Sequence, residues 1–147
     1  MRTTHDAGDK TIGQWMALAI GVAFVVAGIA GFFVTGFDNF TGNTDKTLLG
    51  LEVNGLHNLV HLGLGALGLA MWRTPMGARN YGWITFLGYS LVTLYGFITV
   101  PDEPVLSLNS ADNVFHLVTA LAGLATALLA TRRAGAPDYN ATARGHA

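Results

Sequence analysis

The chain has 147 residues, of which 51% are hydrophobic and only 12% are charged. A soluble domain carries about 25% charged residues, so this composition is typical of an integral membrane protein of one domain. The formal net charge of −1 gives no reason to expect a nucleic-acid partner, and a chain without cysteine has no disulfide, thiolate metal site or cysteine nucleophile.

Four apolar stretches, separated by short polar gaps, are predicted to cross the membrane as helices. Each approaches the roughly 20 residues that span a bilayer core of about 30 Å, and long runs without alternation favour helices over strands. The predicted spans are residues 12–34, 55–72, 81–100 and 111–131, of which the second is short. We therefore expect an all-α four-helix bundle over residues 12–131, with tails at 1–11 and 132–147.

The charged residues are divided between the polar gaps by sign. Basic residues precede the first span, separate the second from the third and follow the fourth, whereas the other two gaps carry five acidic residues and one lysine. The positive-inside rule predicts that both termini and the gap between the second and third spans face the cytoplasm. The basic residues are Arg2, Lys10, Arg73, Arg79, Arg132, Arg133 and Arg144.

A polar motif occurs twice, each time where an apolar span begins. Its copies are residues 54–62 and 109–117, and residues 68–70 match 123–125 further along. The repetition predicts two helical hairpins of the same orientation, related by a parallel internal repeat about an axis along the membrane normal. It is supported by the second and fourth spans, because the first and third match poorly. Asn54, Asn58, His61 and Leu62 match Asn109, Asn113, His116 and Leu117.

Spacings of three or four residues place the polar side chains of each copy on one helix face, near the outer membrane surface. They can form a structural network in which Asn54, and either Ser110 or Asn109, cap the helices and Asp112 complements a helix dipole. Asn58 and Asn113 would bond across helices, and His61 and His116 would do the same from slightly deeper. The protein is then non-enzymatic, either structural or a partner of another membrane complex. Its expected surroundings are the lipid bilayer, and a homo-oligomer is left open.

A metal site is the first functional alternative. His57 and His61 are four residues apart, a spacing that lets two imidazoles on one helix bind the same Zn²⁺ or Cu²⁺. His116 would supply a third ligand, and Asp112 either a fourth ligand or a carboxylate that orients one of the others.

Two further alternatives use the same residues. Haem b needs axial ligands from facing helices, which His61 and His116 could supply. A proton-linked or small-solute transporter would carry ionisable groups near the bilayer midplane, whereas here they lie near one end of the spans.

The third span adds a stripe of small and hydroxyl side chains that we expect to face the bundle: Thr85, Gly88, Tyr89, Val92, Gly96 and Thr99.

The stretch from Val53 to Leu62, together with Ala111 to Leu117 in a four-span chain, resembles a bacterial membrane family catalogued as a domain of unknown function. The resemblance covers about residues 15–131. It implies a small four-helix protein of the bacterial inner membrane and no particular activity. His57, His61 and His116 match the motif of this family, and no role comes with them.

Overall fold

The computed structural model describes residues 10–37, 40–102 and 105–131, so most of the predicted tails lie outside it. The described residues form four helices and one short antiparallel hairpin. In chain order these are α1 (Ile12–Thr35), β1 (Thr47–Leu48), β2 (Leu51–Glu52), α2 (Gly55–Met71), α3 (Pro75–Thr99) and α4 (Ser110–Leu129).

Helices α1, α3 and α4 are long and apolar enough to cross a membrane, with 24, 25 and 20 residues. Helix α2 has 17 residues, which is about 26 Å at 1.5 Å per residue. Large apolar side chains such as Phe33, Leu91 and Phe97 are exposed on the outside of the bundle. Because an apolar outer surface of this extent is stable only in lipid, the protein is a membrane protein whose surroundings are the bilayer.

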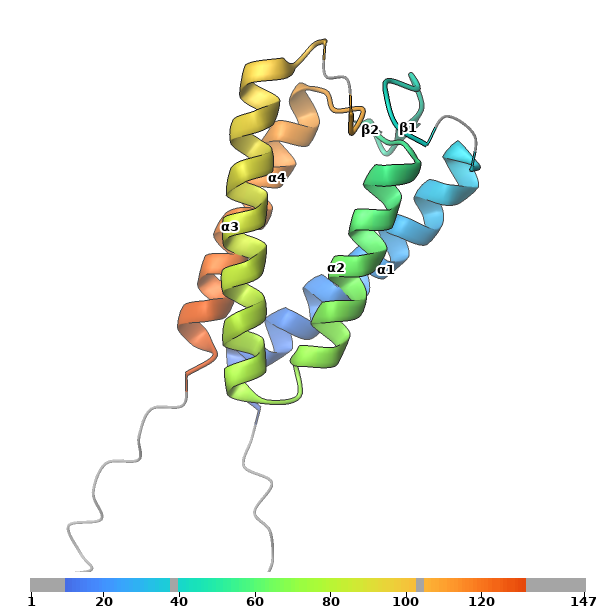
Figure 1. Ribbon diagram of the computed structural model, residues 1–147. Helices are drawn as coiled ribbons and strands as arrows, with labels where there is room; N and C mark the ends of the chain where they lie inside the picture. Colours follow the sequence, from blue (N-terminus) through green and yellow to red (C-terminus); the bar gives the residue numbers. More distant parts are fainter. Residues whose placement is uncertain (1–9, 38–39, 103–104, 132–147) are drawn as a thin grey trace, which may run out of the picture.

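The helices pack closely in two pairs, α1 with α2 and α3 with α4 (Figure 1). Glycines let the backbones approach: a Cβ built on Gly65 would lie 2.8 Å from the carbonyl oxygen of Gly21, and one on Gly123 would lie 3.0 Å from that of Gly82. The all-α four-helix bundle is therefore confirmed. The internal repeat that would relate the two pairs stays a prediction.

Each pair also contains a buried asparagine packed against a glycine. A Cβ on Gly31 of α1 would overlap Oδ1 of Asn58 in α2, and a Cβ on Gly96 of α3 would overlap Oδ1 of Asn113 in α4. Each oxygen thus lies where a glycine Cα–H points, a contact that resembles a weak hydrogen bond. Asn58 Nδ2 also donates to Thr35 Oγ1 at 3.0 Å, which ties α2 to the end of α1.

Two features differ from the predicted spans. Helix α3 begins at Pro75, before the apolar stretch at 81–100, because Thr74 Oγ1 accepts from Gly77 N at 3.0 Å and proline suits the first helical position. The hairpin between α1 and α2 was not predicted. Its turn residues Leu49 and Gly50 both have positive φ, of 55° and 87°, as a tight two-residue turn of this twist requires.

Candidate metal centre

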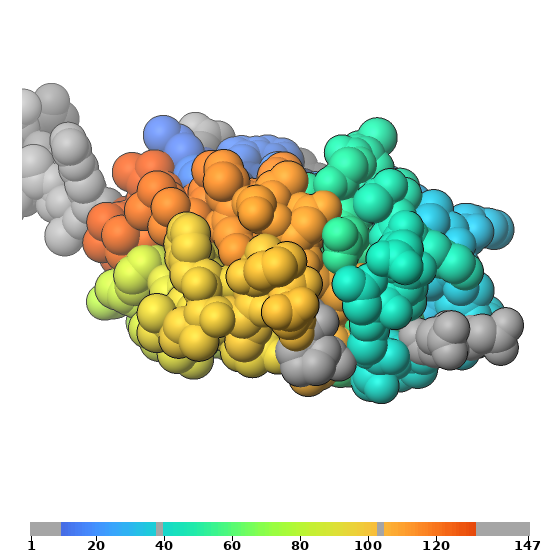
Figure 2. All heavy atoms as spheres, turned by 90° about the horizontal axis from the view of Figure 1, so that it is seen from above, coloured from blue at the N-terminus to red at the C-terminus, as the bar shows by residue number. Residues whose placement is uncertain are grey.

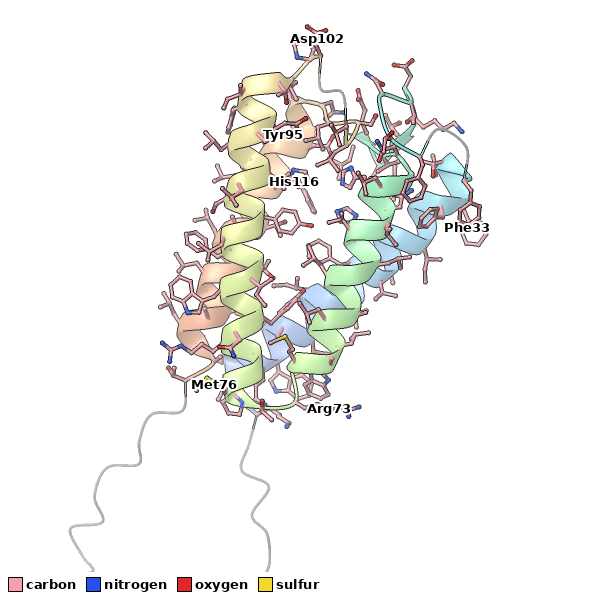
Figure 3. The ribbon with its side chains drawn as sticks, in the orientation of Figure 1. Phe33, Arg73, Met76, Tyr95, Asp102 and His116 are labelled. Atoms are coloured by element: carbon pink, nitrogen blue, oxygen red, sulfur yellow. The ribbon has the colours of Figure 1, made fainter. Side chains whose placement is uncertain are left out.

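Three histidines lie together between the two helix pairs. His57 and His61 come from α2 and His116 from α4, and one ring nitrogen of each lies within 4.8 Å of the other two. The ring centroids are 4.5 Å apart for His57 and His61, and 5.7 Å apart for His57 and His116. Figure 3 shows His116 in the upper half of the bundle, the half that carries the hairpin.

Local capping sets where the histidines fall along their helices. Asn54 Oδ1 accepts from His57 N at 2.8 Å, so Asn54 caps α2, which begins at Gly55, two residues before His57. Asn109 Oδ1 accepts from the backbone N–H groups of Ala111 and Asp112 at 2.9 and 3.0 Å and begins α4. Both caps use the asparagines that the repeated motif places there.

The ring of His57 is held by a loop carbonyl. Its Nδ1 lies 3.2 Å from the carbonyl oxygen of Leu106, and the tautomer that donates this hydrogen bond keeps its lone pair on Nε2. Histidines that bind metals commonly donate their other ring N–H to a backbone carbonyl in this way, which fixes the tautomer and the ring orientation.

His116 is only 4% exposed, and its Nδ1 is buried with no hydrogen-bond partner among the described residues. Two aromatic rings complete the wall around the histidines. The ring centroid of Tyr89 lies 5.2 Å from that of His116, and the ring centroid of Phe24 lies 5.2 Å from that of His61. The rings of Phe24 and Tyr89 stack with their centroids 5.4 Å apart. Sequence reasoning placed Tyr89 on the bundle-facing stripe of the third span but assigned neither ring to a site.

Asp112 does not join the histidines. In the part of the chain that the structure describes, the group of close ligand atoms consists of the three imidazoles. The Asp112 carboxylate is 1% exposed, and its Oδ2 accepts from the backbone N–H groups of Glu52 at 3.0 Å and Asn109 at 2.9 Å. Its role in the structure is to attach the hairpin to the start of α4.

Two of the four asparagines of the predicted cluster, Asn54 and Asn109, join the loops at the histidine end of the bundle. Asn54 Nδ2 donates to the carbonyl oxygens of Gly42 at 2.9 Å and Val105 at 2.7 Å, and Asn109 Nδ2 donates to Gly50 at 3.0 Å. Gly42 N also donates to Val105 O at 3.2 Å. Figure 2 shows the loops before α2 and α4 abutting across the top of the molecule. They form a cap over the histidine end of the bundle.

Two cavities border the histidines on different sides, and the three imidazoles line both. The α2–α3 cavity has a volume of about 130 Å³, and the α1–α4 cavity one of about 270 Å³. Apart from the histidines, the first is lined by Val60, Leu64, Gly88, Tyr89, Val92 and Leu106. The second is lined by Ala23, Phe24, Ala27, Leu48, Leu49, Leu51, Val53, Asp112 and Phe115.

Comparison with known proteins gives one match. No curated protein matches the chain, and no solved structure does. A family model described as "Domain of unknown function (DUF4383)" matches residues 14–129, which include all four helices but for the first two residues of α1. This confirms the resemblance seen in the repeated motif. The chain therefore belongs to the DUF4383 family of unknown function.

Proposed function

We propose that this protein is a small multi-pass membrane protein that binds one transition-metal ion, Zn²⁺ or Cu²⁺, through His57, His61 and His116. The observation that carries the proposal is the approach of three ring nitrogens to within 4.8 Å of one another. Imidazole suits both metals. Ligands at about 2.0–2.1 Å from a tetrahedral ion lie roughly 3.3 Å apart, so small side-chain rotations would close the site around an ion.

Unused hydrogen-bonding capacity favours a metal over a purely structural role for these histidines. A buried polar atom without a partner costs about 1–3 kcal/mol, and His116 Nδ1 is such an atom within the described ranges. A bound ion would offset that cost. The bond between His57 and the Leu106 carbonyl adds the orientation that a metal ligand needs.

The same geometry favours a single ion over haem. Axial ligands must approach iron from opposite faces of the porphyrin, so the plane between His61 and His116 has to be open. A ring nitrogen of His57 lies within 4.8 Å of a ring nitrogen of each, so a porphyrin between His61 and His116 would have a third imidazole beside it.

A second candidate function is the structural one, in which the protein supports or partners another membrane complex and the histidines bind nothing. It is favoured by the loop network, because the side chains of Asn54, Asn109 and Asp112 form hydrogen bonds that join the cap to the helices. The two candidates differ in what they predict for metal content.

We also propose that the histidine end faces the outside of the bacterial inner membrane and that both termini are cytoplasmic. Lys10 precedes α1 and donates to the carbonyl oxygen of Arg73, between α2 and α3, and Arg79 lies near the start of α3. Figure 3 shows Arg73 at this end of the bundle. The loops at the opposite end carry most of the acidic residues of the polar gaps. An excess of basic residues marks the cytoplasmic side.

Metal content tests the proposal directly. The full chain, purified in detergent and stripped with chelator, is titrated with Zn²⁺ or Cu²⁺, and elemental analysis follows removal of excess ion. We expect one ion per chain in the wild type and none in His116→Ala. A matched control replaces His5 and His146, which lie outside the described residues, and should retain the ion.

Helix content by circular dichroism shows that each variant is folded. A wild type that binds no stoichiometric metal, or a folded His116→Ala that binds as well as wild type, would overturn the metal site. If the wild type is metal-free and His116→Ala is merely less stable, the structural candidate stands.

A further inference from the structure

A tetrahedral metal bound by three protein ligands keeps one position for an outside ligand, which is how catalytic sites differ from closed structural ones. The nearest acidic group, Asp112, is committed to two backbone N–H groups. An ion held by the three histidines would border both cavities, because all three imidazoles line each of them. The α2–α3 cavity is distinguished by Tyr89, which lines it and not the other.

Tyr89 provides the second observation. Its side chain is 4% exposed, lines the same cavity, and has a buried hydroxyl with no hydrogen-bond partner in the described part of the chain. A buried tyrosine hydroxyl normally finds a partner, since leaving it without one costs free energy. A molecule in the cavity that carries an acceptor atom would supply the partner.

The cavity walls define the chemical class of this molecule. They are formed by Val60, Leu64, Val92 and Leu106 besides the aromatic and imidazole rings, and the volume is about 130 Å³. The apolar walls and a route from lipid favour a ligand without a hydration shell: a cation would also be repelled by the bound ion, and an anion would gain the charge of the ion only after leaving water. The ligand that fits is small and uncharged and has at least one acceptor atom.

The route to the cavity leads through the side of the bundle. Gly88 lines the cavity, is exposed, and a Cβ built on it would meet no atom of the described chain within 4 Å. The cap loops cover the outer end instead, with Val53 and Leu108 at 3% and 2% exposure. A ligand that partitions into lipid can therefore enter past Gly88.

We propose that the histidine-bound metal keeps an open coordination position facing the α2–α3 cavity, where it binds a small uncharged molecule that enters from the bilayer past Gly88 and accepts a hydrogen bond from Tyr89. This inference rests on the proposed metal site.

Carbon monoxide on the Cu⁺-loaded protein is the probe, because the infrared stretch of bound carbon monoxide reports both coordination and hydrogen bonding. Elemental analysis first establishes that copper is bound. We then expect one carbon monoxide band in the wild type. Tyr89→Phe should keep the copper and shift this band, since only the hydroxyl is removed.

Gly88→Leu should keep the copper and slow carbon monoxide association by about tenfold or more, because the new side chain fills the entrance. Gly63→Leu is the matched control: Gly63 is also an exposed helical glycine whose Cβ would meet no described atom within 4 Å, but it does not line the cavity. It should bind carbon monoxide as the wild type does.

The results separate the two proposals. Absence of bound copper would overturn this inference, and absence of bound Zn²⁺ as well would refute the metal site. Bound copper without a carbon monoxide band would leave the metal site standing and overturn the open position. An unshifted band in Tyr89→Phe would overturn the hydrogen bond, and an unchanged association rate in Gly88→Leu would overturn the entry route.

Discussion

Replacing Gly31 by alanine should separate the first helix pair at its outer end. A Cβ at this position would overlap Asn58 Oδ1 and would lie 2.5 Å from Asn58 Cγ. Asn58 is fully buried, so its side chain cannot swing into open space, and it donates to Thr35 Oγ1 at 3.0 Å. The new methyl group must displace the asparagine or push α1 away from α2.

The expected magnitude follows from three contributions. Breaking the buried hydrogen bond costs about 1–3 kcal/mol, and overpacking a tight contact costs about 1–3 kcal/mol. Alanine has a higher helix propensity than glycine, which returns about 1 kcal/mol. Gly31→Ala should therefore lower the free energy of unfolding by about 1–5 kcal/mol, with a central value near 3.

The assay is unfolding in mixed micelles, in which a denaturing detergent is titrated into a mild one and helix loss is followed by circular dichroism. Gly63→Ala is the control, because its Cβ would meet no atom of the described residues within 4 Å; it should be neutral or slightly stabilising. The double variant Gly31→Ala/Asn58→Ala should be no less stable than Asn58→Ala alone, since the clash is gone.

The contact thus predicts a coupling free energy of about 2–3 kcal/mol between Gly31→Ala and Asn58→Ala. The reasoning is refuted if Gly31→Ala unfolds at the same midpoint as Gly63→Ala, or if the costs of Gly31→Ala and Asn58→Ala simply add.

Three other changes test the remaining features. Asp112→Ala should destabilise the protein by about 1–3 kcal/mol, because two half-buried N–H groups lose their acceptor, while metal content stays at wild-type level. A folded variant without metal would show instead that Asp112 is a ligand. Gln14→Ala should lower the free energy of unfolding by about 1–3 kcal/mol, since the buried Gln14 Nε2 donates to two carbonyl oxygens at the end of α2. Lys10→Ala, which removes an exposed donor, is the control and should barely move the unfolding midpoint. A green fluorescent protein fused to the C-terminus should fluoresce in bacteria and an alkaline phosphatase fused there should be inactive; the reverse pattern would contradict the cytoplasmic C-terminus.

The helices were predictable because their signals are local. Long apolar runs fix the existence of four helices, and Asn54 and Asn109 mark the starts of α2 and α4 as caps. The spacing of His57 and His61 places them on one face, and the repeated motif places His116 at an equivalent depth. The family resemblance rests on these same residues and is confirmed by the match over residues 14–129.

The rest depends on contacts between distant parts of the chain. Tyr89 and Phe24 reach the histidines from α3 and α1, and only helix packing decides that their rings stack there. The hairpin depends on Leu49 adopting a positive φ, which its side chain does not favour. The hydrogen bond from Glu52 N to Asp112 joins distant parts of the chain and could not be predicted from the sequence. The bond from Asn109 N to Asp112 is local, because an acidic residue three positions after the cap is typical of a capping box.

The cap has a consequence for how the protein is made. Asn54, at the start of α2, donates to the carbonyl of Val105, and His57 lies against the carbonyl of Leu106, yet both carbonyls follow α3 in the chain. When the ribosome has released the first two helices, these partners have not been synthesised. The outer half of the first helix pair can therefore mature only after α3 has been inserted and α4 has docked beside it. Loading of the proposed metal site would then follow membrane insertion, and a metal donor would have to reach the finished bundle rather than the nascent chain.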